Sequence, residues 1–218
     1  MESALLLSLK LSALTTLILI LVSLPLAYML SFKEFRGRLL LESLILMPIL
    51  IPPTVLGFYM VYLLGNNSDL GRFIETLTGV KLLFSFEGLV FASIIYSLPF
   101  GVFPIRDAFQ NIPRRYIEIA YAFGYSPLES FFKVILPNSW SGILTSTALV
   151  FAHTMGEFGE VLMVGGNIPG ETRTLSIYIY DEVQALNYRG AHLASLVLLS
   201  VSLCALAVIF FFRRWSLR

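Results

Sequence analysis

Long apolar runs separated by short polar segments dominate the chain. Five of these runs are close to the length that a helix needs to cross the hydrocarbon core of a membrane, about 20 residues. They cover residues 11–30, 43–64, 88–105, 140–162 and 191–212. The pattern predicts an all-α membrane protein, a polytopic helix bundle with about five spanning helices in a single domain, residues 1–218.

Prolines interrupt two of these runs. The second run contains Pro48, Pro52 and Pro53, and the third contains Pro99 and Pro104. Proline removes a backbone donor and kinks a helix, and in lipid the freed groups must be satisfied by protein or by water in a cavity. These spans therefore predict either a bundle with an interior path or ordinary kinked packing, and the sequence leaves both open.

Composition agrees with this class of protein. The chain is 57% hydrophobic and 13% charged, with a mean hydropathy of +0.81, too few charges to cover a soluble domain. The single cysteine, Cys204, excludes a disulfide within the chain, and no Cys/His cluster predicts a metal. His153 and His192 lie among apolar residues and are expected to be hydrogen-bonded packing residues. No nucleic-acid partner is expected.

The first run is expected to remain as a spanning helix rather than to be cleaved as a signal peptide. It is preceded by Glu2 instead of a basic segment, and it is longer than the apolar part of a signal peptide.

The basic residues predict the orientation of the bundle. Ten of the 15 Lys and Arg residues follow the first, third and fifth runs, and basic residues favour the cytoplasmic side. We therefore expect an outside N-terminus and a cytoplasmic C-terminus in the cytoplasmic (inner) membrane. The ten residues are Lys33, Arg36, Arg38, Arg106, Arg114, Arg115, Lys133, Arg213, Arg214 and Arg218.

The segment 113–137 would then be cytoplasmic, and it reads as two short helices with a bend. The apolar face of the first helix is expected to consist of Ile117, Ala120, Tyr121 and Phe123. Gly124 can end that helix in a left-handed cap. Ser126 and Glu129, three residues apart, form a capping box for the second helix, and Pro137 is expected to end it. An amphipathic helix resting on lipid and a helix docked in a partner's groove both remain open, and the acidic residues favour the partner.

The same segment resembles the cytoplasmic EAA loop of ABC-transporter permeases. The resemblance lies in Glu118, Ala120 and Gly124, followed by Leu136-Pro137, and Ile119 departs from it where alanine is usual. It implies a coupling helix that seats in a cleft of a separate ATPase subunit. The residues expected to dock are Arg114, Arg115, Glu118, Ala120, Gly124, Ser126, Leu136 and Pro137.

No enzymatic activity is predicted for this chain. It contains no G-x-x-x-x-G-K-[ST] phosphate loop, no dinucleotide-binding glycine pattern and no Ser/His/Asp set. If transport is driven by ATP, then ATP and Mg²⁺ bind to a partner ATPase.

A second motif begins at Gly156, near the end of the fourth run. Glu157 lies about 27 Å along a helix that starts near residue 139, which would place Glu157 and Glu160 near the outer interface. They could belong to a gate or to a packing face of small residues. The outer loop is expected at 164–189, and three charged residues make a partly embedded helix near 173–184 more favourable than a sixth span.

This motif resembles the molybdate subgroup of ABC permeases. The resemblance lies in Gly-Glu-Phe-Gly from Gly156, in residues 167–170 and 172–175, and in "PILIPPTVLGFY" from Pro48. Sulfate permeases share part of it but are usually longer, and tungstate permeases share parts of the outer turn. The pathway or gate residues that it implies are Pro52, Pro53, Thr54, Gly156, Glu157, Phe158, Gly159, Asn167 and Arg173, with Arg173 as the better candidate for anion contact.

The resemblance implies a homodimeric permease of the type I importer class. Two ATPase subunits and an extracytoplasmic oxyanion-binding protein would be its partners. Its substrate would be molybdate, with tungstate as the alternative. A sulfate-type permease is the first alternative. A secondary transporter or channel is less favoured, because such proteins often have inverted repeats and charges within their spans, and we find no convincing repeat and no charge at the centre of a run.

Overall fold

The chain folds as a bundle of helices, and the described residues contain no β-strand. The computed structural model describes the backbone of residues 1–65 and 68–216 and the side chains of that part up to Phe212. Of the basic residues that predicted the orientation, Arg218 and the side chains of Arg213 and Arg214 lie outside it. The helices are α1 (Glu2–Phe32), α2 (Arg38–Leu50), α3 (Pro53–Leu64), α4 (Asp69–Thr78), α5 (Phe86–Gln110), α6 (Arg114–Ala122), α7 (Pro127–Ser130), η1 (Phe131–Ile135), α8 (Leu136–Asn138), α9 (Trp140–Gly156), α10 (Gly159–Gly165), α11 (Leu175–Gln184) and α12 (Tyr188–Ser216).

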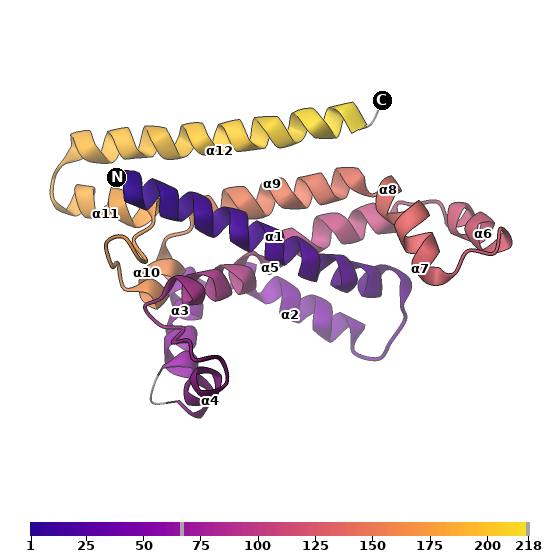
Figure 1. Cartoon of the computed structure of the whole chain (residues 1–218), viewed down its shortest axis with the longest axis horizontal. Coiled ribbons are helices and arrows are strands. Elements are labelled where there is room, and N and C mark those ends of the chain that lie inside the picture. Colours follow the sequence, from indigo (N-terminus) through magenta and orange to yellow (C-terminus); the bar gives the residue numbers. More distant parts are fainter. Residues whose placement is uncertain (66–67, 217–218) are drawn as a thin grey trace.

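Three helices form the centre of the bundle (Figure 1). α1 packs along α5 and α9, and α12 packs against α9 and α11. The segment α6–α8 lies at one end of the bundle, whereas α3, α10, α11 and the N-terminus lie at the other. The two motifs found in the sequence therefore occupy opposite ends of the molecule.

Three helices, α1, α5 and α12, are long and apolar enough to cross a membrane, counting only the described residues. α1 begins nine residues before the predicted run and, with 31 residues, is about 46 Å long. It thus extends beyond a hydrocarbon core of about 30 Å. The count reaches five only when each of two bent helix pairs is taken as one span.

The second and fourth runs are not single helices, which corrects the sequence-based bounds. α2 and α3 meet at 111° across Ile51 and Pro52, where Pro52 and Pro53 withhold two backbone donors. The predicted helix 140–162 ends instead at Gly156. Glu157 has extended backbone angles, φ −65° and ψ 134°, and its carbonyl accepts a hydrogen bond from Ser176.

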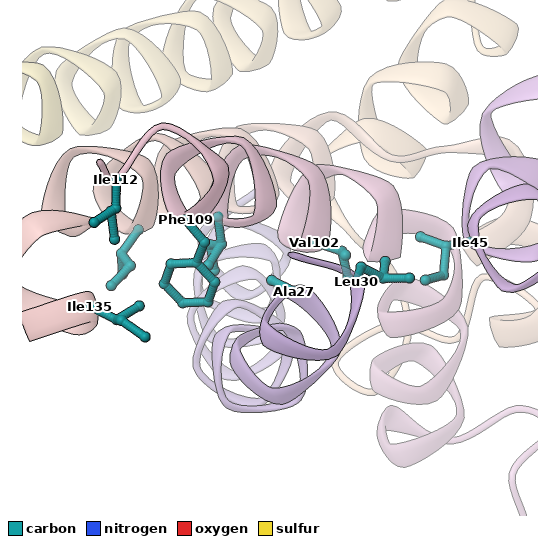
Figure 2. Close-up of a cluster of buried hydrophobic side chains, with 9 residues drawn as sticks. Ala27, Leu30, Ile45, Val102, Phe109, Ile112 and Ile135 are labelled. Carbon is teal, nitrogen blue, oxygen red and sulfur yellow. The ribbon is translucent and has the colours of Figure 1, made fainter. Parts of the chain in front are cut away.

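A core of nine buried side chains holds the end of the bundle that carries α6–α8 (Figure 2). Ala27 and Leu30 come from α1, and Phe109 comes from α5. Ile135 of η1 and Ile112, just after α5, belong to the same core. The segment after the α6–α7 bend is therefore packed directly on the bundle, and a force applied there is transmitted to α1 and α5 through close-packed side chains.

Candidate functional site

The bend between α6 and α7 is built by a left-handed glycine. Gly124 has φ +82°. The Gly124 N–H donates to the Tyr121 carbonyl at 2.9 Å, and the Tyr125 N–H donates to the Ala120 carbonyl at 3.0 Å. This pair of hydrogen bonds is that of a Schellman cap. The predicted end of the first helix at Gly124 is confirmed.

The second helix starts with the predicted capping box. The Ser126 N–H donates to Glu129 Oε2 at 2.9 Å, and the Glu129 N–H donates to Ser126 Oγ at 3.3 Å. Pro127 occupies the first helical turn, where its missing donor costs nothing. The hydrogen bond from the Ser126 backbone lowers the pKa of the Glu129 carboxyl, and Lys133 at 3.5 Å acts in the same direction.

Pro137 does not end this helix, contrary to the sequence-based expectation. α7 continues through η1 into α8 as far as Asn138. η1 is a π-helical turn in which the Leu136 N–H donates to the Phe131 carbonyl, five residues earlier. Such a turn changes the pattern of backbone hydrogen bonds just before Pro137, which has no N–H to donate. The chain bends instead at Ser139, by 69° into α9.

The predicted apolar face of the first helix is divided between two environments. Ala120 is 3% exposed and Ile117 is half-buried against the core, whereas Phe123 is 79% exposed. The prediction of one continuous face is therefore wrong for Tyr121 and Phe123. The exposed apolar side chains form what we call the coupling patch: Ile119, Tyr121, Phe123, Leu128 and Phe132.

Charged residues flank the coupling patch. Arg114, Arg115 and Glu118 are exposed on α6, and Arg115 lies over the ring of Tyr116, 5.5 Å from its centroid. Leu136, in contrast, packs against the core. The predicted docking residues thus include both exposed side chains and residues that shape the bend.

At the other end of the bundle, the structure brings together two motifs that lie about 100 residues apart in sequence. α3 packs against α10. A Cβ placed on Gly159 would lie 3.3 Å from Pro53 Cβ and 3.6 Å from Thr54 Cγ2. One placed on Gly57 would lie 3.0 Å from the Cβ of Met163. Glycine allows this close approach of helices, so the α2–α3 bend and the α9–α10 break form one site.

Two carboxylates are buried beside this contact. Glu157 is 5% exposed and Glu160 is fully buried. Glu157 Oε2 accepts a hydrogen bond from Ser93 Oγ of α5 at 2.8 Å, and the carboxyl groups of Glu157 and Glu160 lie beside each other. Burying such groups is costly, so simple packing is a poor explanation for them.

The remaining candidates of this motif differ in their surroundings. The ring of Phe158 packs against that of Tyr180 of α11, with the ring centroids 5.0 Å apart and the planes tilted by 46°. No atom lies within 4 Å of the place that a Cβ of Gly156 would take, so a packing face of small residues is present at Gly159 but does not include Gly156.

Arg173 is engaged by other protein groups. Its Nε donates to Asn167 Oδ1 at 2.7 Å and lies 3.4 Å from Asp181 Oδ2. Asn167 also donates to Asp181. This triad joins the outer turn to α11, so anion contact by Arg173 would require it to leave two partners.

The histidines have different environments. His153 shares a hydrogen bond with Ser97 at 2.9 Å and packs between Tyr96 and Phe100, as predicted. His192 is exposed, so the packing prediction is wrong there. The described residues hold no group of three or more His, Cys, Asp or Glu that could bind a metal ion.

Residues 11–218 match the family described as "Binding-protein-dependent transport system inner membrane component". The chain belongs to this family. It is 42% identical to the molybdenum transport system permease protein ModB of Azotobacter vinelandii, over 87% of the chain and 84% of that protein. The chain is 32% identical to the Escherichia coli K12 ModB, over 94% of the chain and 90% of that protein. A probable sulfate permease of Chlorella vulgaris is 30% identical over 84% of the chain and 68% of that protein.

Solved structures of ABC importers share the fold. A bacterial transporter that imports alginate matches with a TM-score of 0.81 at 18% identity, over 98% of the chain and 78% of that protein. The MetNI methionine transporter matches with a TM-score of 0.76 at 15% identity, over 99% and 95%. The predicted fold class, a type I importer permease, is confirmed.

Three residues of the α3–α10 site in this inner-membrane component were missed by sequence reasoning. Gly57 makes the closest approach to α10, Ser93 binds Glu157 from α5, and Ser176 binds the Glu157 carbonyl. Gly57 lies inside the quoted "PILIPPTVLGFY", so a glycine in the middle of a helical run was an available signal. No sequence signal pointed to the two serines, because Ser93 and Ser176 contact Glu157 from 64 and 19 residues away in the chain.

Proposed function

We propose that this chain is the membrane permease of an ATP-driven importer of molybdate. The observation that carries the proposal is its 42% identity to the Azotobacter vinelandii ModB over most of both chains. Tungstate is included as a possible substrate, because both ions are tetrahedral dianions of nearly equal size. The sulfate-type alternative rests on the identity to the Chlorella protein, which at 30% is lower than the identity to ModB.

In the proposed assembly, two copies of the permease line one path and two ATPase subunits bind from the cytoplasm. The coupling patch supports this arrangement. It gathers exposed apolar side chains at one end of a membrane bundle, beside charged residues, and exposed apolar patches commonly mark protein interfaces. ATP and Mg²⁺ would bind to the ATPase, and an extracytoplasmic binding protein would deliver the anion at the other end.

The α3–α10 site is proposed to act as the outer gate. Both of its helices begin at breaks, and their contact depends on Gly57 and Gly159. Glu157 and Glu160 offer a dianion neither a positive charge nor an exposed donor, so a role in holding the gate shut fits them better than substrate binding. A small rotation of α10 about the residues between α9 and α10 would change this contact, since hinge residues absorb such motions.

Uptake by purified components tests the substrate. The permease, its ATPase and its binding protein are reconstituted in liposomes, and the accumulation of radioactive molybdate is measured with and without ATP. We expect ATP-dependent uptake that excess tungstate abolishes and excess sulfate leaves unchanged. Equal competition by sulfate would favour the sulfate-type alternative, and uptake without the ATPase would favour a secondary transporter.

Copurification tests the docking assignment. Glu118→Lys reverses a charge beside the coupling patch, and Gly124→Trp strains the bend. We expect both variants to lose ATPase copurification and coupled ATPase activity, whereas Arg72→Gln, on exposed α4 at the other end, retains both. Wild-type assembly and coupling in both loop variants would refute the assignment.

A further inference from the structure

A groove lies where the segment after the bend crosses α1. Its volume is about 620 Å³. One wall is formed by the last two turns of α1 and the residue after it, and the other by α7 and the first residue of η1. The lining residues are Leu24, Pro25, Tyr28, Met29, Lys33, Pro127, Leu128 and Phe131. Apart from Lys33, these are all uncharged and mostly apolar.

The groove continues an exposed apolar stripe on α1. Leu17, Leu21, Pro25 and Tyr28 are spaced by four, four and three residues, so they lie on one face of the helix. Leu17 is 62% exposed and Leu21 is 63% exposed. The rise from Leu17 to Tyr28 is about 16 Å, close to half of a hydrocarbon core of about 30 Å. The stripe therefore spans about one leaflet and ends in the groove.

A cation stands at the end of this stripe. Lys33 is exposed directly after α1 and makes no salt bridge within the described part of the chain. Lys133, the nearby cation on η1, is paired with Glu129 and lies over the ring of Tyr125. Lys33 lines both this groove and the neighbouring cavity, whereas Glu34 lines only the neighbouring cavity. Lys33 is thus available to an anion at the mouth of the groove.

We propose that this groove binds a single anionic glycerophospholipid. One acyl chain lies along the Leu17–Tyr28 stripe and enters between Tyr28 and Leu128, and the phosphate of the headgroup lies at Lys33. An exposed apolar stripe about one leaflet long that runs into an apolar groove with a cation at its polar end matches such a lipid. A soluble anion has no chain to cover the stripe or fill the groove. The inference does not depend on which anion the transporter carries.

The bound lipid would touch one edge of the coupling patch, because Leu128 belongs to both the patch and the groove. Tyr28 packs edge-on against Phe131 at 5.5 Å, and Phe131 in turn packs against Phe109 of the core. Filling the groove would therefore support α7 against α1. We expect the lipid to raise the fraction of ATPase cycles that are coupled to transport.

Native mass spectrometry of the complete transporter tests the site. Dioleoyl phosphatidylglycerol and dioleoyl phosphatidylcholine carry the same chains but differ in charge. We expect a single phosphatidylglycerol per permease chain to be retained, and phosphatidylcholine to be lost at the same collision energy. Lys33→Gln should weaken phosphatidylglycerol binding about fivefold. Arg36→Gln, which removes a positive charge from the same connection but outside the groove, should bind like the wild type.

A second variant separates the chain from the headgroup. Met29→Trp fills the groove and keeps Lys33, so it should also lose the bound lipid while still copurifying with the ATPase. Inorganic phosphate in excess should not displace the lipid.

Three results would overturn the proposal. They are equal retention of the two lipids, equal binding by Lys33→Gln and Arg36→Gln, and a complete transporter that retains no lipid because the ATPase covers the groove. None of these results bears on molybdate uptake, so failure here is distinct from failure of the proposed function.

Discussion

Gly124 carries a backbone conformation that other residues adopt only with strain. Its φ is +82°, and no atom lies within 4 Å of the position that a Cβ would take. The requirement for glycine is therefore conformational and not steric. It also has a structural consequence, because the angle between α6 and α7 decides where the coupling patch lies.

We predict that Gly124→Ala destabilises the loop by about 1–2 kcal/mol, the cost of placing an L-residue in the left-handed region. Gly156→Ala is the matched control, since its Cβ also enters open space but its backbone is helical. Thermal unfolding of the two variants in the reconstituted transporter is compared. Equal effects of the two substitutions would show that the conformation of Gly124 is not the reason for glycine at this position.

At the scale of elements, the short helix α7 depends on its cap. Four residues cannot form a stable helix alone, so the hydrogen bonds between Ser126 and Glu129 and the packing of η1 hold it. At the other end of the bundle, the contact between α3 and α10 depends on small residues, Gly57 and Gly159, instead of helix caps.

The capping box predicts a specific pH dependence. The pKa of Glu129 is lowered from 4.5, so its stabilising effect is fully present above that value and is lost as the pH falls through the lowered value. Protection of the α7 amides from hydrogen exchange should therefore be constant between about pH 6 and 8 and decline below about pH 4. Ser126→Ala should reduce this protection by about 1 kcal/mol at neutral pH, and Ser126→Thr should retain most of it. Unchanged protection in Ser126→Ala would mean that packing alone holds the helix.

A graded series at Gly57 tests the contact between α3 and α10. Its Cβ would lie 3.0 Å from Met163 Cβ and 3.4 Å from the Glu160 Cα, so alanine requires a shift of a few tenths of an ångström and leucine forces the helices apart. We expect molybdate uptake to fall in the order Gly, Ala, Leu. ATPase copurification should stay unchanged, because this site lies at the end opposite to the coupling patch (Figure 1). Normal uptake in Gly57→Leu would exclude this contact from the gate.

At the scale of the whole molecule, the bundle has two chemically different ends and an apolar belt between them. The belt is clearest on α12, because almost none of the apolar stretch of this helix is buried by the rest of the chain. Its exposed leucines, Leu193, Leu196, Leu199 and Leu203, must be covered by lipid or by a second permease copy. The end that carries α6–α8 is the more basic one, with Lys33 after α1, Arg106 in α5, and Arg114 and Arg115 in α6.

The positive-inside pattern predicts the sides of the membrane. In a Cys204→Ser background, Gln110→Cys at the end of α5 should react with a membrane-impermeant maleimide only from the cytoplasm. Glu171→Cys in the outer turn should react only from outside. Both side chains are exposed and lie at opposite ends of the bundle. Labelling of both from the same side would contradict the predicted topology.

The sequence by itself determined the class of protein, the apolar runs and the chemistry of the α6–α7 bend. These features depend on residues close in sequence. A Schellman cap joins residues five apart, and a capping box joins residues three apart, so their partners can be read from the chain. The family motifs added the class of machine and its proposed cargo.

The tertiary structure alone decided where α9 ends and which motifs meet. The end of α9 at Gly156, the closeness of Gly57 to α10 and the pairing of Arg173 with Asp181 were not evident from local patterns. Tyr121 and Phe123 were likewise assigned to a buried face that the bundle does not cover. The physical reason is the same in each case: these features depend on side chains of separate helices, and close packing between distant segments overrides the periodicity within one of them.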